Sequence, residues 1–337
     1  MIYSKKELID YISLMEKTAP RINAMQPFFA GTASGVRDKP LVPYEGNETL
    51  LLKTSSCTLL HSFFQEYKKR QSFFERHFAS SIPYVMENEC RMGTALLKYF
   101  SKKNNKNYSV IHLGASEAPM ARTIAYLGLK FNVKTLATSC TKENKRGFFM
   151  YEEKPINTYF LPIPWIFVNK ELLKSKQLDN FNTGFDVIFE HQLFQFFSKD
   201  RGKQVALASK LFKDLSKGLF FMTGKIALND IEEFKRRESQ KDKEFKSKYF
   251  SQDDINSKDK EVIHIFNKML LTLDETIKEI KKTLKYSVVI WNSGNFYTII
   301  SSNSKNEIDM YLSVLDEPII EKKYVYYPCN IQDLKFL

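Results

Sequence analysis

The apolar positions of this chain change period along its length, and each change predicts where a strand or a helix lies. Short apolar runs of strand length occur at 109–113, 133–138, 157–162, 185–191 and 218–223. Between several of these runs the apolar residues recur at helical spacing, most clearly at 200–216. Strands that alternate with helices in this way predict a parallel sheet in a three-layer α/β domain.

The stretch 108–128 contains the clearest of these changes. Its strand-like run stops at the small residues Gly114, Ala115 and Ser116, and a helical pattern follows immediately. A strand, a tight turn and a helix N-terminus bring backbone N–H groups to a place where they can face a ligand. The sequence therefore predicts a ligand site at this turn.

The first eighty residues are predicted to be largely helical. Residues 3–17 and 57–78 have apolar or aromatic residues at helical spacing, whereas 20–56 contains four prolines and is predicted to be irregular. The basic residues between the aromatics of 57–78 could bind nucleic acid, but a buried stripe opposite a solvated face is the favoured interpretation. Serine followed by proline at 80–83 predicts a helix that runs to about Lys102.

The alternation of strands and helices stops at 228–285. This segment is highly charged and helical, and 262–284 has apolar residues at core spacing. Two apolar runs then flank the polar turn 292–295, which predicts a β-hairpin. A short helix and a strand at 323–327 are predicted in the remaining tail.

Composition and charge narrow the class of protein. The chain has 337 residues, of which 43% are hydrophobic and 14% aromatic, so a folded core is expected. The net charge of +12 favours an anionic partner such as RNA, although a lysine-rich genome would produce the same excess. The four cysteines lie far apart, which argues against a zinc ribbon or a disulfide framework.

The same survey predicts a soluble, cytoplasmic protein. No apolar run approaches the roughly 20 residues of a membrane span. The N-terminal pattern is that of an amphipathic helix and not of a secretory leader. We therefore expect free thiols in a reducing compartment.

The order of elements resembles the class I S-adenosylmethionine (SAM)-dependent methyltransferases. The segments that carry the resemblance are VIHLGAS, FDVIFEH, GLFFMTG and VVIWNSGNFYTII, taken in that order. The resemblance implies a three-layer, Rossmann-like α/β domain over 85–302, with a mostly parallel sheet closed by an antiparallel hairpin. It also implies a helical N-terminal region (1–84), a helical insertion at about 228–285, a C-terminal extension (303–337) and SAM as the cofactor.

The resemblance further implies a set of site residues. For the cofactor these are the turn Gly114, Ala115, Ser116 and Glu117, the end of the second strand at Thr138 and Ser139, and Glu190. For catalysis they are His191 as base, its neighbour Glu190, and Lys225.

Two motifs depart from the family pattern, the turn after the first strand and the end of the second strand. His112 stands where the family usually has an acidic residue, and only Gly114 remains of the usual two or three glycines. Thr138 and Ser139 stand near the place of a carboxylate that binds the ribose hydroxyls. A neutral substitute there would forfeit roughly 1–3 kcal/mol of binding.

These observations leave several functions open. The first is methyl transfer from SAM to an unidentified acceptor, with a small molecule slightly favoured. The second is a catalytically silent protein of the same fold that binds or scaffolds. A third is RNA methylation, for which Lys98 and Lys225 match two members of a Lys-Asp-Lys-Glu tetrad, while His191 and Asn295 occupy the other two positions. A NAD(P) dehydrogenase is disfavoured because Gly-x-Gly-x-x-Gly is absent.

The insertion is expected to cover the acceptor pocket or to form a dimerisation arm.

Overall fold

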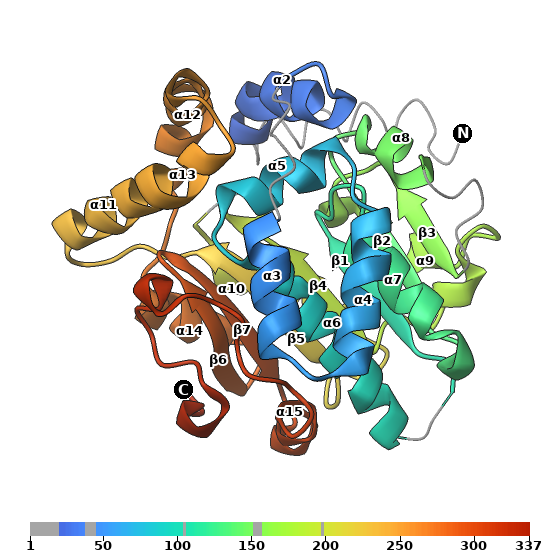
Figure 1. Cartoon of the computed structure of the whole chain (residues 1–337). Helices are drawn as coiled ribbons and strands as arrows, with labels where there is room; N and C mark the ends of the chain where they lie inside the picture. The colour runs from blue at the N-terminus through green and yellow to red at the C-terminus, as the bar shows by residue number, and fades with distance from the viewer. Residues whose placement is uncertain (1–19, 38–44, 104–105, 151–156, 197–198) are drawn as a thin grey trace.

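A mixed seven-stranded sheet forms the centre of the computed structural model, which describes residues 20–37, 45–103, 106–150, 157–196 and 199–337. The strand order is β3-β2-β1-β4-β5-β7-β6 (Figure 1). The first five strands pair in parallel, and β7 runs antiparallel to both β5 and β6. The strands are β1 (Ser109–Leu113), β2 (Lys134–Thr138), β3 (Thr158–Leu161), β4 (Val187–His191), β5 (Leu219–Lys225), β6 (Tyr286–Ser293) and β7 (Phe296–Ser302). The predicted fold class, including the closing hairpin, is confirmed.

The sheet is buried on both faces because successive side chains of its central strands enter two different cores. In β1, Val110 packs into one core, and Ile111 packs into the other. Phe189 and Ile188 of β4 divide in the same way. This explains why the strands appear in the sequence as nearly continuous apolar runs.

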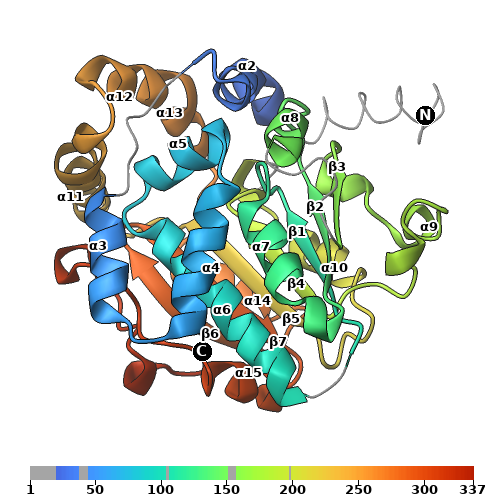
Figure 2. The same cartoon turned by 45° about the vertical axis from the view of Figure 1, so that its right-hand side comes forward.

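Helices cover both faces and complete the three layers (Figures 1 and 2). The core on the first face includes residues of α4 (Thr58–Lys69), α6 (Val85–Lys103), α7 (Pro119–Leu127) and α15 (Lys305–Leu312). The core on the second face includes residues of α9 (Lys170–Leu173), α10 (Arg201–Ser209) and α14 (Leu273–Ile280). No helix in the described ranges is long and apolar enough to cross a membrane.

The N-terminal region differs from the sequence prediction in two places. Residues predicted to be irregular form α2 (Pro20–Ser34) and α3 (Glu45–Thr54). Pro20 is the first residue of α2, where a helix needs no N–H donor, so this proline marks a helix start. The predicted helix over 57–78 is two helices, because α4 ends before Arg70 and α5 (Phe73–Ser81) begins after Ser72. The predicted helix at 3–17 lies outside the described residues.

Three predicted element boundaries also change. The Ser80–Pro83 stretch is not a helix start, since α5 ends at Ser81 and α6 begins at Val85, although α6 does end near the predicted position. The helix predicted over 200–216 ends at Ser209. The tail forms a 3₁₀ turn at Lys322–Tyr324 in place of the predicted strand.

The insertion is a set of short helices that turns back on itself. It comprises α11 (Ile231–Gln240), α12 (Gln252–Lys258) and α13 (His264–Asn267), with π-helical turns at Lys241–Phe245 and Asp259–Ile263. The single helix predicted over 262–284 is interrupted because Thr272 forms a capping box with Glu275 and starts α14 there.

The insertion meets α2 at one end of the molecule. Met25 and Phe28 of α2 share a small core with Phe234 and Val262 of the insertion. In both views α2 lies beside α12 and α13, beyond the ends of the strands (Figures 1 and 2). We call α2, α5 and residues 231–267 the roof.

Candidate active site

A cavity of about 150 Å³ opens where the chain leaves the carboxyl ends of β1, β2 and β4. Gly114, Ser139 and His191, which follow or end these three strands, all line it. Strand β1 lies between β2 and β4, so the strand order reverses at this point. Ligands of open α/β sheets bind at such a switch point.

The turn after β1 forms the floor of the cavity, and its backbone requires small residues. Gly114 has φ +70°, and a Cβ atom there would lie 2.8 Å from Leu193 Cδ2. Its N–H donates to Thr138 Oγ1 over 3.3 Å, which ties the turn to the end of β2. Ala115 and Ser116 line the cavity beside it. The predicted ligand turn thus borders this cavity.

Two carboxyl groups and a phenol form a buried chain on one wall. The Tyr67 hydroxyl lies 2.6 Å from Glu75 Oε1 and 2.7 Å from Glu89 Oε2. A phenol has one proton to donate, so one of the two carboxyl groups must itself carry a proton. Burial, together with the charges of Glu89 and Glu117, raises the pKa of Glu75 well above its usual range. Glu75 therefore carries the proton, and Tyr67 donates to Glu89.

Glu89 continues this chain to a pair of histidines. His191 Nδ1 lies 3.4 Å from Glu89 Oε1, and His191 Nε2 lies 2.9 Å from His112 Nδ1. Burial, and then the neighbouring His191, hold the pKa of His112 well below its usual range, so His112 is neutral. A neutral His112 can accept the Nε2 proton of His191, which leaves Nδ1 of His191 facing Glu89 and the cavity. The contact at Nδ1 is longer than an ordinary hydrogen bond and is the one a ligand could open.

Sequence reasoning missed a neutral hydrogen-bond acceptor, Asn144, which follows β2 in the chain. Ser139 Oγ accepts hydrogen bonds from Thr141 N and from Asn144 Nδ2, so its hydroxyl is already engaged. Asn144 also lines the cavity, and its Oδ1 is buried with no hydrogen-bond partner among the described residues. Asn144 is the first residue of α8 (Asn144–Phe149), a short helix whose position in the sequence gave no signal of a ligand group.

Four of the residues that the sequence nominated do not line the cavity. Thr138 is occupied by the Gly114 N–H. The carboxylate of Glu117 accepts the N–H groups of Ser72 and Glu75 over 2.6 and 3.1 Å, and so caps α5.

The other two nominated residues, Glu190 and Lys225, are buried beside the cavity wall. Glu190 Oε1 accepts the N–H groups of Leu193 and Phe194, and burial raises the pKa of Glu190 to about 7. Lys225 Nζ lies 2.5 Å from Glu238 Oε2, and burial lowers the pKa of Lys225 to about 8. Both side chains contribute to the shape of the site through the segments that they fix.

The lysines of the RNA-methyltransferase pattern do not meet at the cavity. Lys98 Nζ lies 2.8 Å from Asp316 Oδ2, away from the lining residues. Asn295, at the position expected for the tetrad glutamate, donates to Glu238 Oε1 over 2.9 Å. Among the described residues no group of three histidine, cysteine or acidic side chains could hold a metal ion.

The roof closes the cavity with aromatic and basic side chains. Sequence reasoning assigned Phe74 and Phe78 to a core stripe, since helical spacing alone cannot separate a core stripe from a cavity wall, and it predicted irregular structure around Phe28 and Phe29. The roof residues that line the cavity are Phe28, Phe29, Phe74, Glu75, His77, Phe78, Ser81, Lys241, Lys246, Lys258, Val262 and Ile263.

Comparison with known proteins gives distant structural likenesses only. No family model matches the chain, and no curated protein matches it. The plantazolicin methyltransferase BpumL in complex with SAH is 13% identical, covers 76% of this chain and 100% of its own, and has a TM-score of 0.42. Magnesium protoporphyrin IX methyltransferase from Synechocystis PCC 6803, also with bound SAH, is 8% identical, covers 76% and 97%, and scores 0.39. A probable spermidine synthase from Corynebacterium glutamicum is 10% identical, covers 67% and 69%, and scores 0.38.

Proposed function

We propose that this protein is a SAM-dependent methyltransferase that acts on a small molecule. The observation that carries the proposal is the continuous cavity that begins at the small-residue turn after β1 and ends under the roof beside His191. At one end, the small-residue turn lets a cofactor come close to the backbone at the switch point of the sheet. The other end is closed from above by the aromatic and basic side chains of the roof, which suits a small acceptor.

The residues at the floor fit the cofactor. The turn at Gly114–Ser116 allows close approach of the backbone, and Asn144 Oδ1 can accept a hydrogen bond from a ribose hydroxyl. The carboxylate of Glu89 suits the positive charge of SAM. Its sulfonium supplies an electrophilic methyl group, so the protein mainly has to align the acceptor and exclude water.

His191 and Glu89 are the groups that we assign to the acceptor. An acceptor hydroxyl or amine placed at the 3.4 Å contact between His191 Nδ1 and Glu89 Oε1 could pass its proton to His191. The Nε2 proton of His191 would remain on the bond to neutral His112. In this arrangement His112 is a positioning residue, because it fixes the tautomer and the ring orientation of His191.

Calorimetry with SAM and S-adenosylhomocysteine (SAH) tests the cofactor assignment. We expect binding to both ligands, and the absence of heat at millimolar concentrations of either one would refute the proposal. Asn144→Asp restores a carboxylate near the ribose, so its SAH affinity should rise by about tenfold, whereas Asn144→Leu should bind more weakly. Lys145→Ala, at an exposed neighbour, serves as the control and should leave the affinity unchanged. Equal SAH affinity in the wild type and both Asn144 variants would contradict the ribose assignment.

A binding protein without catalytic activity is the second candidate. It is favoured by the position of Glu89 Oε1, which lies 3.4 Å from His191 Nδ1, where an acceptor would have to enter. In that case SAH would bind, but no methyl group would leave SAM in the presence of any acceptor. Transfer of radiolabel from methyl-labelled SAM to a metabolite pool decides between the two.

A further inference from the structure

The lysines of the roof have no part in the methyl-transfer proposal. Lys241 and Lys246 are only 5% and 3% exposed, and with Lys258 they line the same cavity as His191. We propose that they bind a carboxylate or phosphate group on an otherwise apolar ligand. The assignment of that ligand as the methyl acceptor rests on the proposed function, whereas the anion site itself rests on the lysines.

The roof lysines share their carboxylate partners with one another and with Lys225. Glu238 Oε2 lies 2.5 Å from Lys225 Nζ and 2.7 Å from Lys241 Nζ. Asp242 Oδ1 lies 2.7 Å from Lys246 Nζ and 3.7 Å from Lys241 Nζ. Three ammonium groups therefore contact the same two carboxylates, and two of the three, those of Lys241 and Lys246, belong to residues that line the cavity.

The surroundings of Lys246 stabilise its charged form less well than those of Lys241. Burial, and then the charge of Lys241, lower the pKa of Lys246, so these two effects disfavour its charged form. A buried charge with incomplete neutralisation destabilises the fold. A bound anionic group would offset this cost and would gain charge-assisted hydrogen bonds in return.

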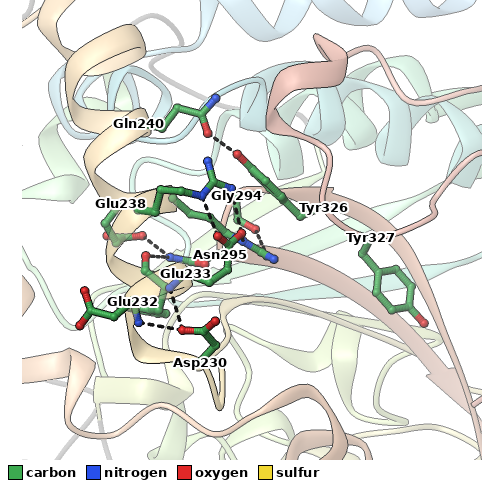
Figure 3. A network of polar contacts seen from close by, with 12 residues as sticks. Asp230, Glu232, Glu233, Glu238, Gln240, Gly294, Asn295, Tyr326 and Tyr327 are labelled. Atoms are coloured by element: carbon green, nitrogen blue, oxygen red, sulfur yellow. Dashed lines mark hydrogen bonds and ion pairs between the residues drawn. The ribbon is translucent and has the colours of Figure 1, made fainter.

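The lysines are held in place by a polar network that ties α11 to the hairpin. Figure 3 shows Glu238 and Asn295 directed toward one another, with Asn295 Nδ2 donating to Glu238 Oε1 over 2.9 Å. Tyr326 from the tail contacts Gln240 at the other end of α11 (Figure 3). Because the hairpin and tail fix this helix, Lys241 reaches the cavity from a rigid base, which is what a pre-organised binding site requires.

Two neutral donors add to the positive wall. Gln192 and Gln195 line the cavity, and the Nε2 atom of each is buried with no hydrogen-bond partner among the described residues. Gln195 Oε1 accepts the Lys225 N–H over 3.2 Å, which leaves its amide nitrogen as the group available to a ligand. Buried donors without partners indicate a ligand that accepts hydrogen bonds.

The distribution of charge across the cavity sets the chemical class. Glu89 lies beside His191 at the end of β4, whereas the lysines belong to the roof. The roof phenylalanines that line the cavity have no polar group to offer. The best ligand is therefore an apolar molecule that carries an anionic group at the end beneath the roof.

A pair of fluorescent probes tests this inference on the full chain. Anilinonaphthalene sulfonate and its uncharged parent, N-phenyl-naphthylamine, share an apolar ring system and differ in the anionic group. We expect the sulfonate to bind the wild-type protein more tightly. Lys246→Met should weaken the sulfonate by roughly tenfold and leave the uncharged parent unchanged, because one charge-assisted contact is lost. Lys243→Met, at an exposed position of the same turn, should change neither.

Equal affinity of the two probes for the wild type, or an equal loss of both in Lys246→Met, would overturn the inference. Lys258→Met, in a different helix of the roof, repeats the measurement if circular dichroism shows that Lys246→Met is unfolded. SAH calorimetry on the same samples separates the two proposals. If the protein prefers the sulfonate but does not bind SAH, the methyl-transfer proposal is refuted and the anion site stands. If it binds SAH but does not prefer the sulfonate, the anion site is refuted and the methyl-transfer proposal stands.

Discussion

Glu87 gives a quantitative test of how burial of a carboxyl group changes the stability of this protein with pH. It lies in the first turn of α6 with 0% exposure, and no other described residue donates a hydrogen bond to its carboxyl oxygens. Burial raises the pKa of Glu87 to about 8 from an ordinary value of 4.5, and its own backbone N–H opposes this only in part. Because the folded pKa is the higher one, the stability associated with this group is complete below pH 4.5. It is lost as the pH rises through about 8.

The magnitude follows from the difference between the two pKa values. A shift of about 3.5 units at 1.36 kcal/mol per unit corresponds to a loss of about 5 kcal/mol by pH 9, and about 3 kcal/mol of this is already lost at pH 7. Glu87→Gln keeps the shape of the side chain and removes its titration. The variant should therefore be close to the wild type at pH 5 and more stable by about 3–5 kcal/mol at pH 9.

Urea unfolding at pH 5, 7 and 9, followed by circular dichroism, measures this difference. Other buried carboxyl groups titrate in both proteins, so the difference between variant and wild type isolates Glu87. Glu232→Gln, whose parent side chain is 77% exposed, is the matched control and should shift stability by the same small amount at every pH. A difference between Glu87→Gln and wild type that does not change from pH 5 to pH 9 would refute the reasoning.

Three further variants test the site. Gly114→Ala must place a Cβ at φ +70° against Leu193, so thermal melts should show a loss of about 1–3 kcal/mol; if Leu193→Ala restores none of it, the clash is not the cause. Glu89→Gln should lower kcat by about a hundredfold with a smaller effect on the KM for SAM; an unchanged kcat counts against the pair. Glu238→Gln leaves two buried lysines short of a carboxylate and should cost about 3 kcal/mol in urea unfolding; a neutral result would mean that the network is not needed for stability.

Much of the sheet could be predicted because neighbouring residues in the sequence determine where each strand and turn lies. The apolar run of β1 ends at a glycine whose positive φ forces the turn, and the hairpin turn at Gly294 has φ +59°. Both features appear directly in the sequence as small or polar residues between apolar runs. The mostly parallel sheet and its closing antiparallel hairpin followed from the resemblance, and the structure confirms both.

The site was less predictable because it is built from distant contacts. The break between α4 and α5 depends on the carboxylate of Glu117, which lies 45 residues from the Ser72 N–H that it accepts. Asn144 and Glu89 each look unremarkable in the sequence, and only the fold brings them to the same cavity as His191. Helical spacing identified the aromatic faces of α5 and the insertion but could not show that they enclose a space.

The contact between α2 and the insertion has a consequence for the order in which the molecule matures during synthesis. Arg37 Nη2 lies 2.5 Å from Glu261 Oε1, across 224 residues of sequence. Because this ion pair is partly exposed, it adds little, and the shared apolar core of Phe28 and Val262 must hold the two segments together. The ribosome releases α2 long before the insertion exists, so an emerging chain exposes these apolar side chains until its last third arrives. Ligand affinity should therefore develop last, and it would report completed folding better than helix content does.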